Sequence, residues 1–569
     1  MQIVAFFLLY LAWLEPLHLL PWVSWHNELL AFAAALMMFA EIIWRRRRIC
    51  GSNITADVRM PTIAIMPLVV GAVVAMQALS GMILFTGDAL LILMYLATVW
   101  MALTAGYNLG FGPPLQGHQR YLSAPFMLAA TIVCAALVST LWAWLQTLDV
   151  WRNLDLIMRQ TQLRRPGANL AQPNQLATLI LMGVVSLVYL AEVFRLRWLW
   201  VRIGGAFLLS GLAITESRTG LLNYGFLAIW WWLGARRLNG KSMEISAVVG
   251  GIFLLTFTFA WPGLWAQFHG LTGDTAVNTG VNTGAGTRPT VWLQLFGAVL
   301  ERPWLGWGAG QVVQAHNAVL HQYEVSEAFS YAHNIVLDAF IGFGFLGGGA
   351  AISVVALWFL TRARKITNWQ AWYGLGLFLV LGVHSMLEFP FAYAYFLVPV
   401  FFSVGLMEAS TESRRFIILK WWPTTLGFGI LTMIMAYSVY EYIQIEEDFR
   451  IARSEVMHIG HTPQDYERPK IVLLTQLGAM LEAIRLEPTP DMSEESMDLI
   501  RRAALRYPWS ALQKRYALSL ALNGRLEEAE RQLKVIRALY GMEAFEEERN
   551  RWTKLADTQY PQLLKVKFP

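Results

Sequence analysis

The sequence predicts an all-α membrane protein whose helices cross the bilayer many times. Of its 569 residues, 56% are hydrophobic and only 15% are charged, whereas soluble domains carry about 25% charged residues. The apolar residues form successive runs, and a helix needs about 20 of them to cross a hydrocarbon core of about 30 Å. The formal net charge of +5 is spread over short basic clusters between those runs, which argues against nucleic-acid binding.

The apolar runs predict about 12–13 transmembrane helices. Their approximate limits are 2–15, 29–44, 62–84, 88–106, 122–146, 174–193, 198–215, 220–234, 245–265, 334–360, 370–387, 390–408 and 417–440. The first run has no basic segment before it and no small-residue cleavage site after it, so we expect a retained span and not a signal peptide. The two cysteines offer neither a disulfide framework nor a Cys-based metal site.

Basic clusters between the runs predict the orientation. They fall after alternate spans, at Arg45–Arg48, His118–Arg120, Arg195–Arg197, Arg236–Lys241, Arg362–Lys365 and Arg414–Arg415. All of them reach one side if the N-terminus is cytoplasmic, as the positive-inside rule requires. We therefore expect a multi-pass protein of a bacterial inner membrane. Its C-terminus and its long polar loop would then face the periplasm.

Four regions follow from this pattern: N-terminal transmembrane helices (1–268), a large periplasmic loop (269–333), C-terminal transmembrane helices (334–440) and a periplasmic α-helical domain (441–569). In the last region, charged residues are frequent and apolar residues recur at helical spacing. Residues 511–529 resemble a tetratricopeptide helix pair with Gly524 in the turn. The alternative is a solvated helical appendage without a specific role.

The loop 269–333 is a candidate for function because loops of this length in compact proteins are usually either functional or disordered. Arg288 lies where an apolar helical pattern begins, directly before Pro289. A helix that starts there presents free amides to whatever Arg288 binds. Arg302 could bind substrate, pair with Glu301 or lie at the membrane interface.

His333 closes the loop and opens the next span, which predicts an imidazole at the membrane–water boundary. Imidazole titrates close to neutral pH, so it can accept a proton from a hydroxyl group. His316 and His321 are five residues apart, which does not fit the i, i+4 pairing of a helical zinc site. We expect no metal ion and no other cofactor.

Arg218 lies in a tight break between two spans on the predicted periplasmic side. An arginine there binds an anion, pairs with Glu216 or anchors to lipid headgroups. His384 and Glu388 lie in another break on the same side, and a carboxylate at membrane depth needs a polar partner. That partner could be an arginine of the site.

Tyr393 and Tyr395 follow in the same segment. They are aromatic-belt anchors or they line a pocket. Gln172 and Gln175 belong to an amide-rich segment just before a span, and carboxamides suit sugar hydroxyls. A helix cap formed by Asn174 would give the same pattern.

Together, Arg218, Arg288 and His333 suggest one chemistry at the outer edge of the membrane. Arginine forks match pyrophosphate oxygens and stabilise the charge that develops as this group leaves. A histidine, or water that it orients, would activate the incoming hydroxyl. The natural donor at that depth is a sugar linked to a polyisoprenyl pyrophosphate, whose lipid lies among the spans.

Several motif segments carry a resemblance: Pro21–Glu28, Gly167–Ala177, Glu216–Gly220, Arg302–Gly308, Ala332–Asp338 and His384–Phe396. In these segments the sequence resembles the bacterial O-oligosaccharyltransferases, the protein or pilin glycosylation ligases of the O-antigen ligase and polymerase superfamily. The segments around Gln172 and His384, and the C-terminal region, look like the protein-directed branch. Phe389 and Phe391 depart from the pattern of that branch, which could shape the acceptor pocket without changing the reaction class.

The resemblance implies a metal-independent, inverting transfer of a preassembled glycan. The glycan moves en bloc from undecaprenyl pyrophosphate to a Ser or Thr of a pilin or another exported protein. It implies that Arg218 and Arg288 hold the pyrophosphate and that His333 is catalytic. The residues expected to bind substrate or support the site are Gln172, Gln175, Arg302, His384, Glu388, Tyr393 and Tyr395.

Other functions remain as alternatives. The same chemistry could ligate O-antigen to lipid A–core or polymerise the glycan. A transporter of lipid-linked sugars would show inverted repeats and charges near the bilayer midplane, but the polar residues here gather on one side. A scaffold is a further class, and it would not depend on Arg218 or His333.

Overall fold

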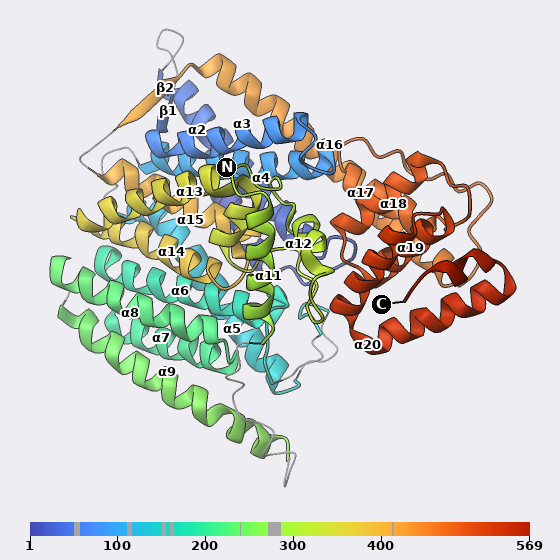
Figure 1. Ribbon diagram of the computed structural model, residues 1–569. Coiled ribbons are helices and arrows are strands. Elements are labelled where there is room, and N and C mark those ends of the chain that lie inside the picture. The colour runs from blue at the N-terminus through green and yellow to red at the C-terminus, as the bar shows by residue number, and fades with distance from the viewer. Residues whose placement is uncertain are drawn as a thin grey trace. The chain divides into compact units, whose positions relative to one another are not determined.

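The computed structural model describes residues 1–50, 57–110, 117–150, 155–159, 164–238, 241–270, 286–411 and 415–568, without the side chains of 46–50, 117–119 and 241–245. Residues 271–285 of the predicted loop and Arg414 of the last basic cluster lie outside this part. The described chain is mostly helical (Figure 1).

One helix lies over each predicted apolar run. These are α1 (Gln2–Leu14), α2 (Trp25–Cys50), α3 (Ile65–Leu79), α4 (Thr86–Gly110), α5 (Ala124–Thr147), α6 (Pro173–Phe194), α7 (Trp198–Ile214), α8 (Arg218–Leu238), α9 (Lys241–Phe268), α13 (Ile335–Arg364), α14 (Trp369–Ser385), α15 (Ala394–Ser410) and α16 (Trp421–Val456). Among the described helices, eight are long and apolar enough to cross a membrane, and α1, α7 and α15 are apolar but shorter. The chain is therefore a helical, polytopic membrane protein. The exact number of spans stays a prediction.

A short antiparallel sheet is a feature that the sequence did not predict. It pairs β1 (Val58–Pro61) with β2 (Phe416–Leu419), with Val58 opposite Leu419. The side chain of Asn108 on α4 fixes β1, because it accepts a hydrogen bond from the N–H of Arg59 and donates one to its carbonyl. The expected span 417–440 was wrong at its start, where β-branched Ile417 and Ile418 favour a strand and the helix begins only at Trp421.

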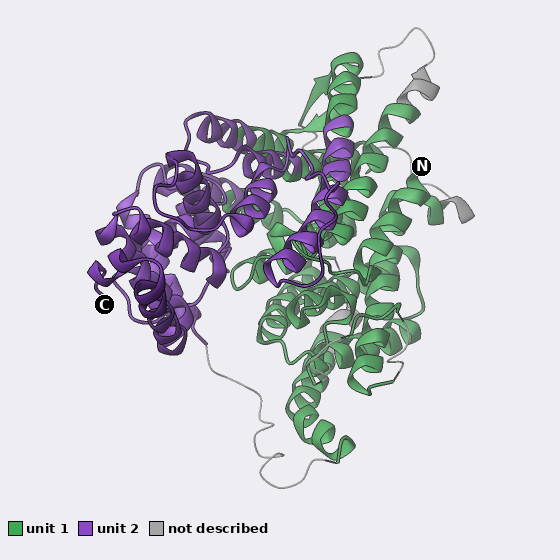
Figure 2. Ribbon diagram, turned by 90° about the vertical axis from the view of Figure 1, so that its right-hand side faces the viewer, with its two compact units in different colours: residues 1–69, 95–283, 356–432 green, residues 70–94, 284–355, 433–569 purple. Residues whose placement is uncertain are grey.

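The chain forms two compact units (Figure 2). Unit 1 comprises residues 1–69, 95–283 and 356–432, and unit 2 comprises residues 70–94, 284–355 and 433–569. In unit 1, α6 packs against α5, α7, α8 and α14, and most of its residues are buried. Small residues bring α4 and α15 close together: a Cβ at Gly405 would lie 2.1 Å from the carbonyl oxygen of Leu103. Such contacts are typical of packed membrane helices.

In unit 2, the predicted periplasmic loop contains two helices, α11 (Arg288–Glu301) and α12 (Val312–Leu320). The helical pattern expected to begin at Arg288 is thus confirmed, whereas α12 was not anticipated. Their facing apolar residues, among them Val291, Leu295, Ala315 and Val319, form a common core. Most of the described part of this loop is therefore a packed structure.

The C-terminal part of unit 2 contains α17 (Thr475–Arg485), α18 (Glu494–Arg506), α19 (Ser510–Leu522) and α20 (Leu526–Thr558). Helix α16 runs on to Val456, beyond the predicted limit at residue 440, because Tyr442, Ile445, Phe449 and Ala452 continue a buried face at helical spacing. Gly524 lies in the turn between α19 and α20 with φ +79°, so the predicted turn is confirmed. The tetratricopeptide assignment stays a prediction.

Candidate functional site

His333 has an unusual backbone conformation. Its φ is +53°, in the left-handed region that residues other than glycine seldom adopt. It lies directly before Asn334, whose side-chain oxygen caps α13 by accepting the N–H groups of Val336 and Leu337 at 3.0 and 3.1 Å. Strained residues of this kind persist only where their surroundings fix them, and they cluster at functional sites.

The neighbours of His333 provide this constraint. The Trp292 indole on α11 donates to the Ala332 carbonyl at 2.7 Å, and the Asp338 carboxylate accepts the Ala332 N–H at 3.1 Å. The ring of Phe329 lies 4.5 Å from the half-buried imidazole, centroid to centroid. The imidazole is therefore held in a defined position at the start of a membrane-spanning helix.

Arg288 and Arg302 lie at the two ends of α11, in the same unit as His333. Arg288 is the first helical residue and Pro289 the second, so the predicted start is confirmed. The exposed Arg302 places its guanidinium 4.1 Å above the ring centroid of Trp307. Because Trp292 also lies on α11, this helix links Arg288 to the backbone beside His333.

A buried polar network holds the segment between α12 and His333. His316 Nε2 lies 3.0 Å from Gln294 Oε1, which also accepts the hydroxyl of Ser326 at 2.6 Å. Burial lowers the pKa of His316 to about 4, which keeps its imidazole neutral. Ser326 also donates its N–H to the Ala538 carbonyl of α20 at 2.8 Å. His316 is thus a packing residue of unit 2.

In unit 1, Asn174 connects three motif segments. Its Oδ1 accepts the hydroxyl of Ser217 at 2.6 Å, and its Nδ2 donates to Glu388 Oε1 at 2.8 Å. Ser217 in turn accepts the Gly220 N–H at the start of α8. Asn174 is thus one polar partner of Glu388, whereas the sequence analysis assigned it only a possible role as a helix cap. A spacing of 214 residues between Asn174 and Glu388 gives no signal in a single sequence.

The other expected supporting residues lie in the same unit. The buried hydroxyl of Tyr395 donates to Gln175 Oε1 at 2.8 Å, and the rings of Tyr393 and Tyr395 stack at 5.1 Å. His384 is buried, with its Nδ1 2.5 Å from the hydroxyl of Thr178. Gln172 is half-buried at the N-cap of α6. These contacts tie α6 to the segments around α14 and α15.

Basic side chains gather around Arg218, which is exposed at the start of α8. Arg164 binds both carboxylate oxygens of Glu216, at 2.6 and 2.8 Å. Arg165 donates to the Thr215 carbonyl at 3.2 Å. Burial lowers the pKa of Arg165, Glu216 raises it, and the nearby charges of Arg218 and Arg164 lower it further. The like charges of Arg164, Arg165 and Arg218 therefore oppose one another here.

The sequence analysis did not select Arg164 and Arg165 as candidate site residues. The positive-inside rule could have identified them, because two adjacent arginines on the predicted periplasmic side are as unexpected there as Arg218. Backbone strain is frequent in the motif segments: of eight described non-glycine residues with positive φ, Ala168, Ala171, Glu216 and His333 lie in them. Arg218 belongs to unit 1, whereas Arg288, Arg302 and His333 belong to unit 2.

Among the described residues, no group of three His, Cys, Asp or Glu is arranged to hold a metal ion.

Three family models match the chain over the motif segments from Gly167 onward. Residues 166–191 match the family model of the protein glycosylation ligases, residues 203–352 that of the O-antigen ligases, and residues 372–555 that of the C-terminal part of virulence-factor membrane-bound polymerases. Gln172 and Gln175 fall in the first match, Arg218, Arg288, Arg302 and His333 in the second, and His384, Glu388, Tyr393 and Tyr395 in the third.

Two relatives come from Acinetobacter baylyi. A general O-oligosaccharyltransferase is 25% identical over 539 residues, covering 94% of this chain and 91% of its own. A ComP-specific O-oligosaccharyltransferase is 28% identical over 449 residues, covering 78% and 79%. Together with the motifs, these matches identify the chain as a relative of the O-oligosaccharyltransferases in the O-antigen ligase superfamily, and as an enzyme of the glycosyltransferase type.

Proposed function

We propose that the protein moves a preassembled glycan en bloc from undecaprenyl pyrophosphate to a Ser or Thr hydroxyl of a pilin or another periplasmic protein. In this single displacement, the acceptor oxygen bonds to the anomeric carbon while the bond from that carbon to the pyrophosphate oxygen breaks. The configuration inverts, undecaprenyl pyrophosphate leaves, and the hydroxyl proton passes to the protein. No metal ion takes part.

The fixed position of His333 is the observation that carries the proposal. A general base must be held within hydrogen-bond reach of the proton that it takes, and the contacts of Ala332, Asn334 and Phe329 restrict the imidazole in this way. His333 would accept the hydroxyl proton as the glycosidic bond forms. His316, which burial keeps neutral, serves packing instead.

Arg218 and Arg288 are proposed to bind the pyrophosphate. Their guanidinium groups would neutralise the charge that grows on the leaving oxygen. The neighbouring Arg165 supports this role for Arg218, because its depressed pKa reflects burial and the like charges beside it, which an anion would offset. Gln172, Gln175, Arg302, His384, Glu388, Tyr393 and Tyr395 would then shape the substrate site.

An in vitro transfer assay tests the proposal. The purified protein, a lipid-pyrophosphate-linked glycan and a purified pilin are mixed in the presence of EDTA. We expect transfer to Ser or Thr by the wild type, a loss of about 100- to 10,000-fold in His333→Ala, and about 100-fold in Arg218→Ala or Arg288→Ala. Exposed His461 and the α8 residue Arg236, each changed to Ala, serve as matched controls.

The matches to O-antigen ligases and to membrane-bound polymerases favour a second candidate. In that case, the glycan would be ligated to lipid A–core or added to another lipid-linked glycan. Product analysis in the same assay separates these reactions. Elongated lipid-linked glycan without modified pilin would contradict the choice of acceptor, whereas normal pilin transfer in His333→Ala would contradict the assigned base.

A further inference from the structure

A groove of about 420 Å³ lies in unit 1, and none of its lining residues belongs to the candidate site. Its walls come from α2, α4, β2 and the first turns of α16. Volumes of this size are typical of ligand pockets. The groove therefore offers a binding site separate from the residues assigned to glycosyl transfer.

Aromatic rings form the floor of the groove. Phe39 on α2 lies 5.2 Å from Trp100 on α4 and 5.4 Å from Phe428 on α16, measured between ring centroids. The remaining walls are also mostly apolar, with Met101, Ile418 and Leu431 among them. An apolar surface of this kind favours a hydrocarbon chain over a polar ligand.

One cation lies at this groove. Lys420 is the charged residue among its lining side chains, and it follows the last paired residue of β2, Leu419. Its carbonyl accepts the hydroxyl of Thr424 at 2.9 Å, which fixes the step from the strand into α16. The backbone at Lys420 is thus fixed beside an apolar groove, and its side chain supplies the positive charge that a headgroup phosphate requires.

The sequence also predicts a membrane–water boundary at Lys420. Trp421 and Trp422 are exposed and open a helix long and apolar enough to span the bilayer. Exposed tryptophans at span ends are typical of the interfacial belt. The groove consequently runs from the headgroup level, at Lys420, toward the hydrocarbon, at Leu431.

We propose that this groove holds an anionic phospholipid of the bilayer. One acyl chain lies on the floor formed by Phe39, Trp100 and Phe428, and the phosphate pairs with Lys420. The lipid fills the space between α2, α4 and α16, where the two-stranded sheet begins. This inference is independent of the proposed glycosyl transfer.

Two glycines on α16 provide a test with a matched control. Gly427 lines the groove, and a Cβ added there meets no atom within 4 Å. Gly429 lies on the same helix outside the lining residues, and its added Cβ also meets no atom within 4 Å. The side chain of leucine at residue 427 therefore starts from open space in the groove lining and should occupy the groove, whereas leucine at residue 429 should leave it open.

Native mass spectrometry of the delipidated full chain measures binding of phosphatidylglycerol and of phosphatidylcholine with the same acyl chains. We expect Gly427→Leu to weaken phosphatidylglycerol binding by about tenfold, the effect of removing about two methylenes from contact, and Gly429→Leu to leave it unchanged. Lys420→Gln should reduce the preference for phosphatidylglycerol about fivefold, since one interfacial cation is lost.

Two results would overturn the proposal. Equal phosphatidylglycerol binding by the two leucine variants would show that the lipid does not bind in this groove. Equal binding of phosphatidylglycerol and phosphatidylcholine by the wild type would show that the site does not select an anionic headgroup. If Gly427→Leu does not fold, the Lys420→Gln comparison decides, because that side chain is exposed and its replacement leaves the packing intact.

Discussion

Asn174 uses both ends of its side-chain amide, and each end requires a different chemistry. The oxygen accepts from Ser217, and the nitrogen donates to the Glu388 carboxylate. A carboxylate has acceptors only, and an aliphatic side chain has neither group. The residue therefore joins the start of α8 to the end of α14 in a way that its closest substitutes do not reproduce.

Asn174→Asp should place two carboxylates against each other. We expect a loss of about 2–3 kcal/mol in the free energy of unfolding, the usual cost of an unsatisfied buried polar group, together with a lower transfer rate. Thermal unfolding in detergent and the transfer assay measure the two effects. Asn550→Asp is the matched control, because Asn550 is exposed on α20 and surface substitutions of this kind change stability little. Wild-type stability of Asn174→Asp would refute this assignment.

The buried imidazole of His316 predicts a pH dependence of stability. Burial lowers its folded-state pKa to about 4, whereas the unfolded chain takes up the proton near pH 6.5. Between these values the unfolded state binds more protons, so stability falls as the pH drops from about 6.5 to about 4, by up to about 3 kcal/mol. Above pH 6.5 this contribution is constant.

The midpoint of thermal unfolding at pH 7.5 and at pH 5 measures this effect. We expect His316→Gln, which keeps a donor toward Gln294, to show a smaller decrease than the wild type between the two pH values. Exposed His461→Gln should keep the wild-type decrease. An identical decrease in all three proteins would show that His316 does not control this pH range.

Among individual residues, the sequence analysis identified ionisable side chains in unusual positions. It did not identify ordinary side chains whose role depends on the partners that folding brings to them. Arg218 and His333 were singled out because an arginine and a histidine at the periplasmic ends of spans are costly without a function. Asn174 and Gln146 are ordinary amides until folding brings Glu388 beside the first and Met158 beside the second. A single sequence does not contain such long-range pairings.

At the scale of elements, α13 is broken where the sequence predicted one continuous span. Gly344 has φ +66° and ψ −176°. The segment from Pro303 to Trp307 fills the break: Trp307 donates its N–H to the Ile341 carbonyl, and Phe345 donates to the Pro303 carbonyl, both at 2.7 Å. Protein groups thus satisfy the backbone that the break frees, as membrane depth requires.

Gly344→Ala should be strongly destabilising. Its φ is in the left-handed region, and an added Cβ would lie 2.2 Å from the Trp304 carbonyl oxygen, so the backbone must move. We expect a cost of several kcal/mol and poor recovery of folded protein in size-exclusion chromatography. Gly349→Ala on the same helix meets no atom within 4 Å and should be neutral or slightly stabilising. Equal yields of the two variants would contradict the need for this break.

The sequence did not predict this break because glycines are frequent in transmembrane helices, and Gly344 lies among several others in the span. What distinguishes it is the docking of the Arg302–Trp307 segment, which comes from a different part of the chain. The helices themselves were predictable, since their length and hydrophobicity are set by the bilayer.

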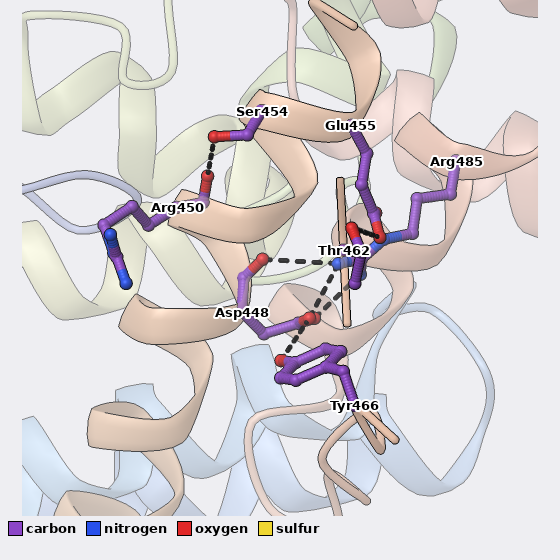
Figure 3. A network of polar contacts seen from close by, with 7 residues as sticks. All are labelled: Asp448, Arg450, Ser454, Glu455, Thr462, Tyr466 and Arg485. Atoms are coloured by element: carbon purple, nitrogen blue, oxygen red, sulfur yellow. Dashed lines mark hydrogen bonds and ion pairs between the residues drawn. The ribbon is translucent and has the colours of Figure 1, made fainter. Parts of the chain in front are cut away.

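A buried ion-pair network joins α16 to α17 (Figure 3). Arg485 donates to Asp448 at 2.7 and 2.8 Å and to Glu455 at 2.6 Å, and the hydroxyl of Tyr466 donates to Asp448 at 2.8 Å. Burial, the hydrogen bond to Asp448 and its charge raise the pKa of Tyr466 to about 12. The network fixes the start of the C-terminal helices on the last turns of α16.

Arg485→Met should leave the buried Asp448 carboxylate uncompensated, at a cost of about 3–5 kcal/mol. We expect a lower unfolding midpoint and faster limited proteolysis between residues 457 and 474. Arg450→Met removes an exposed pair with Glu447 and should leave stability nearly unchanged. Equal proteolysis rates in the two variants would show that the network does not hold this junction.

For the whole molecule, composition alone was sufficient to predict a helical membrane protein, because apolar length and low charge are properties of the chain that need no tertiary information. A second general rule, the distribution of basic residues, predicts the orientation. In that orientation the segment between α13 and α14 would lie in the cytoplasm and the C-terminal helices in the periplasm.

Cysteine labelling tests this orientation. In a chain with Cys50 and Cys134 replaced by Ser, we expect Glu495→Cys on α18 to react with a membrane-impermeant maleimide in cells whose outer membrane is permeabilised. Thr367→Cys, between α13 and α14, should react only after the inner membrane is disrupted. Both residues are exposed, so access to the reagent and not burial determines the result. The reverse pattern would place the C-terminal helices and the α13–α14 connection on the opposite sides. The reverse labelling pattern would also exclude the assigned reaction, because the proposed donor is presented at the periplasmic face.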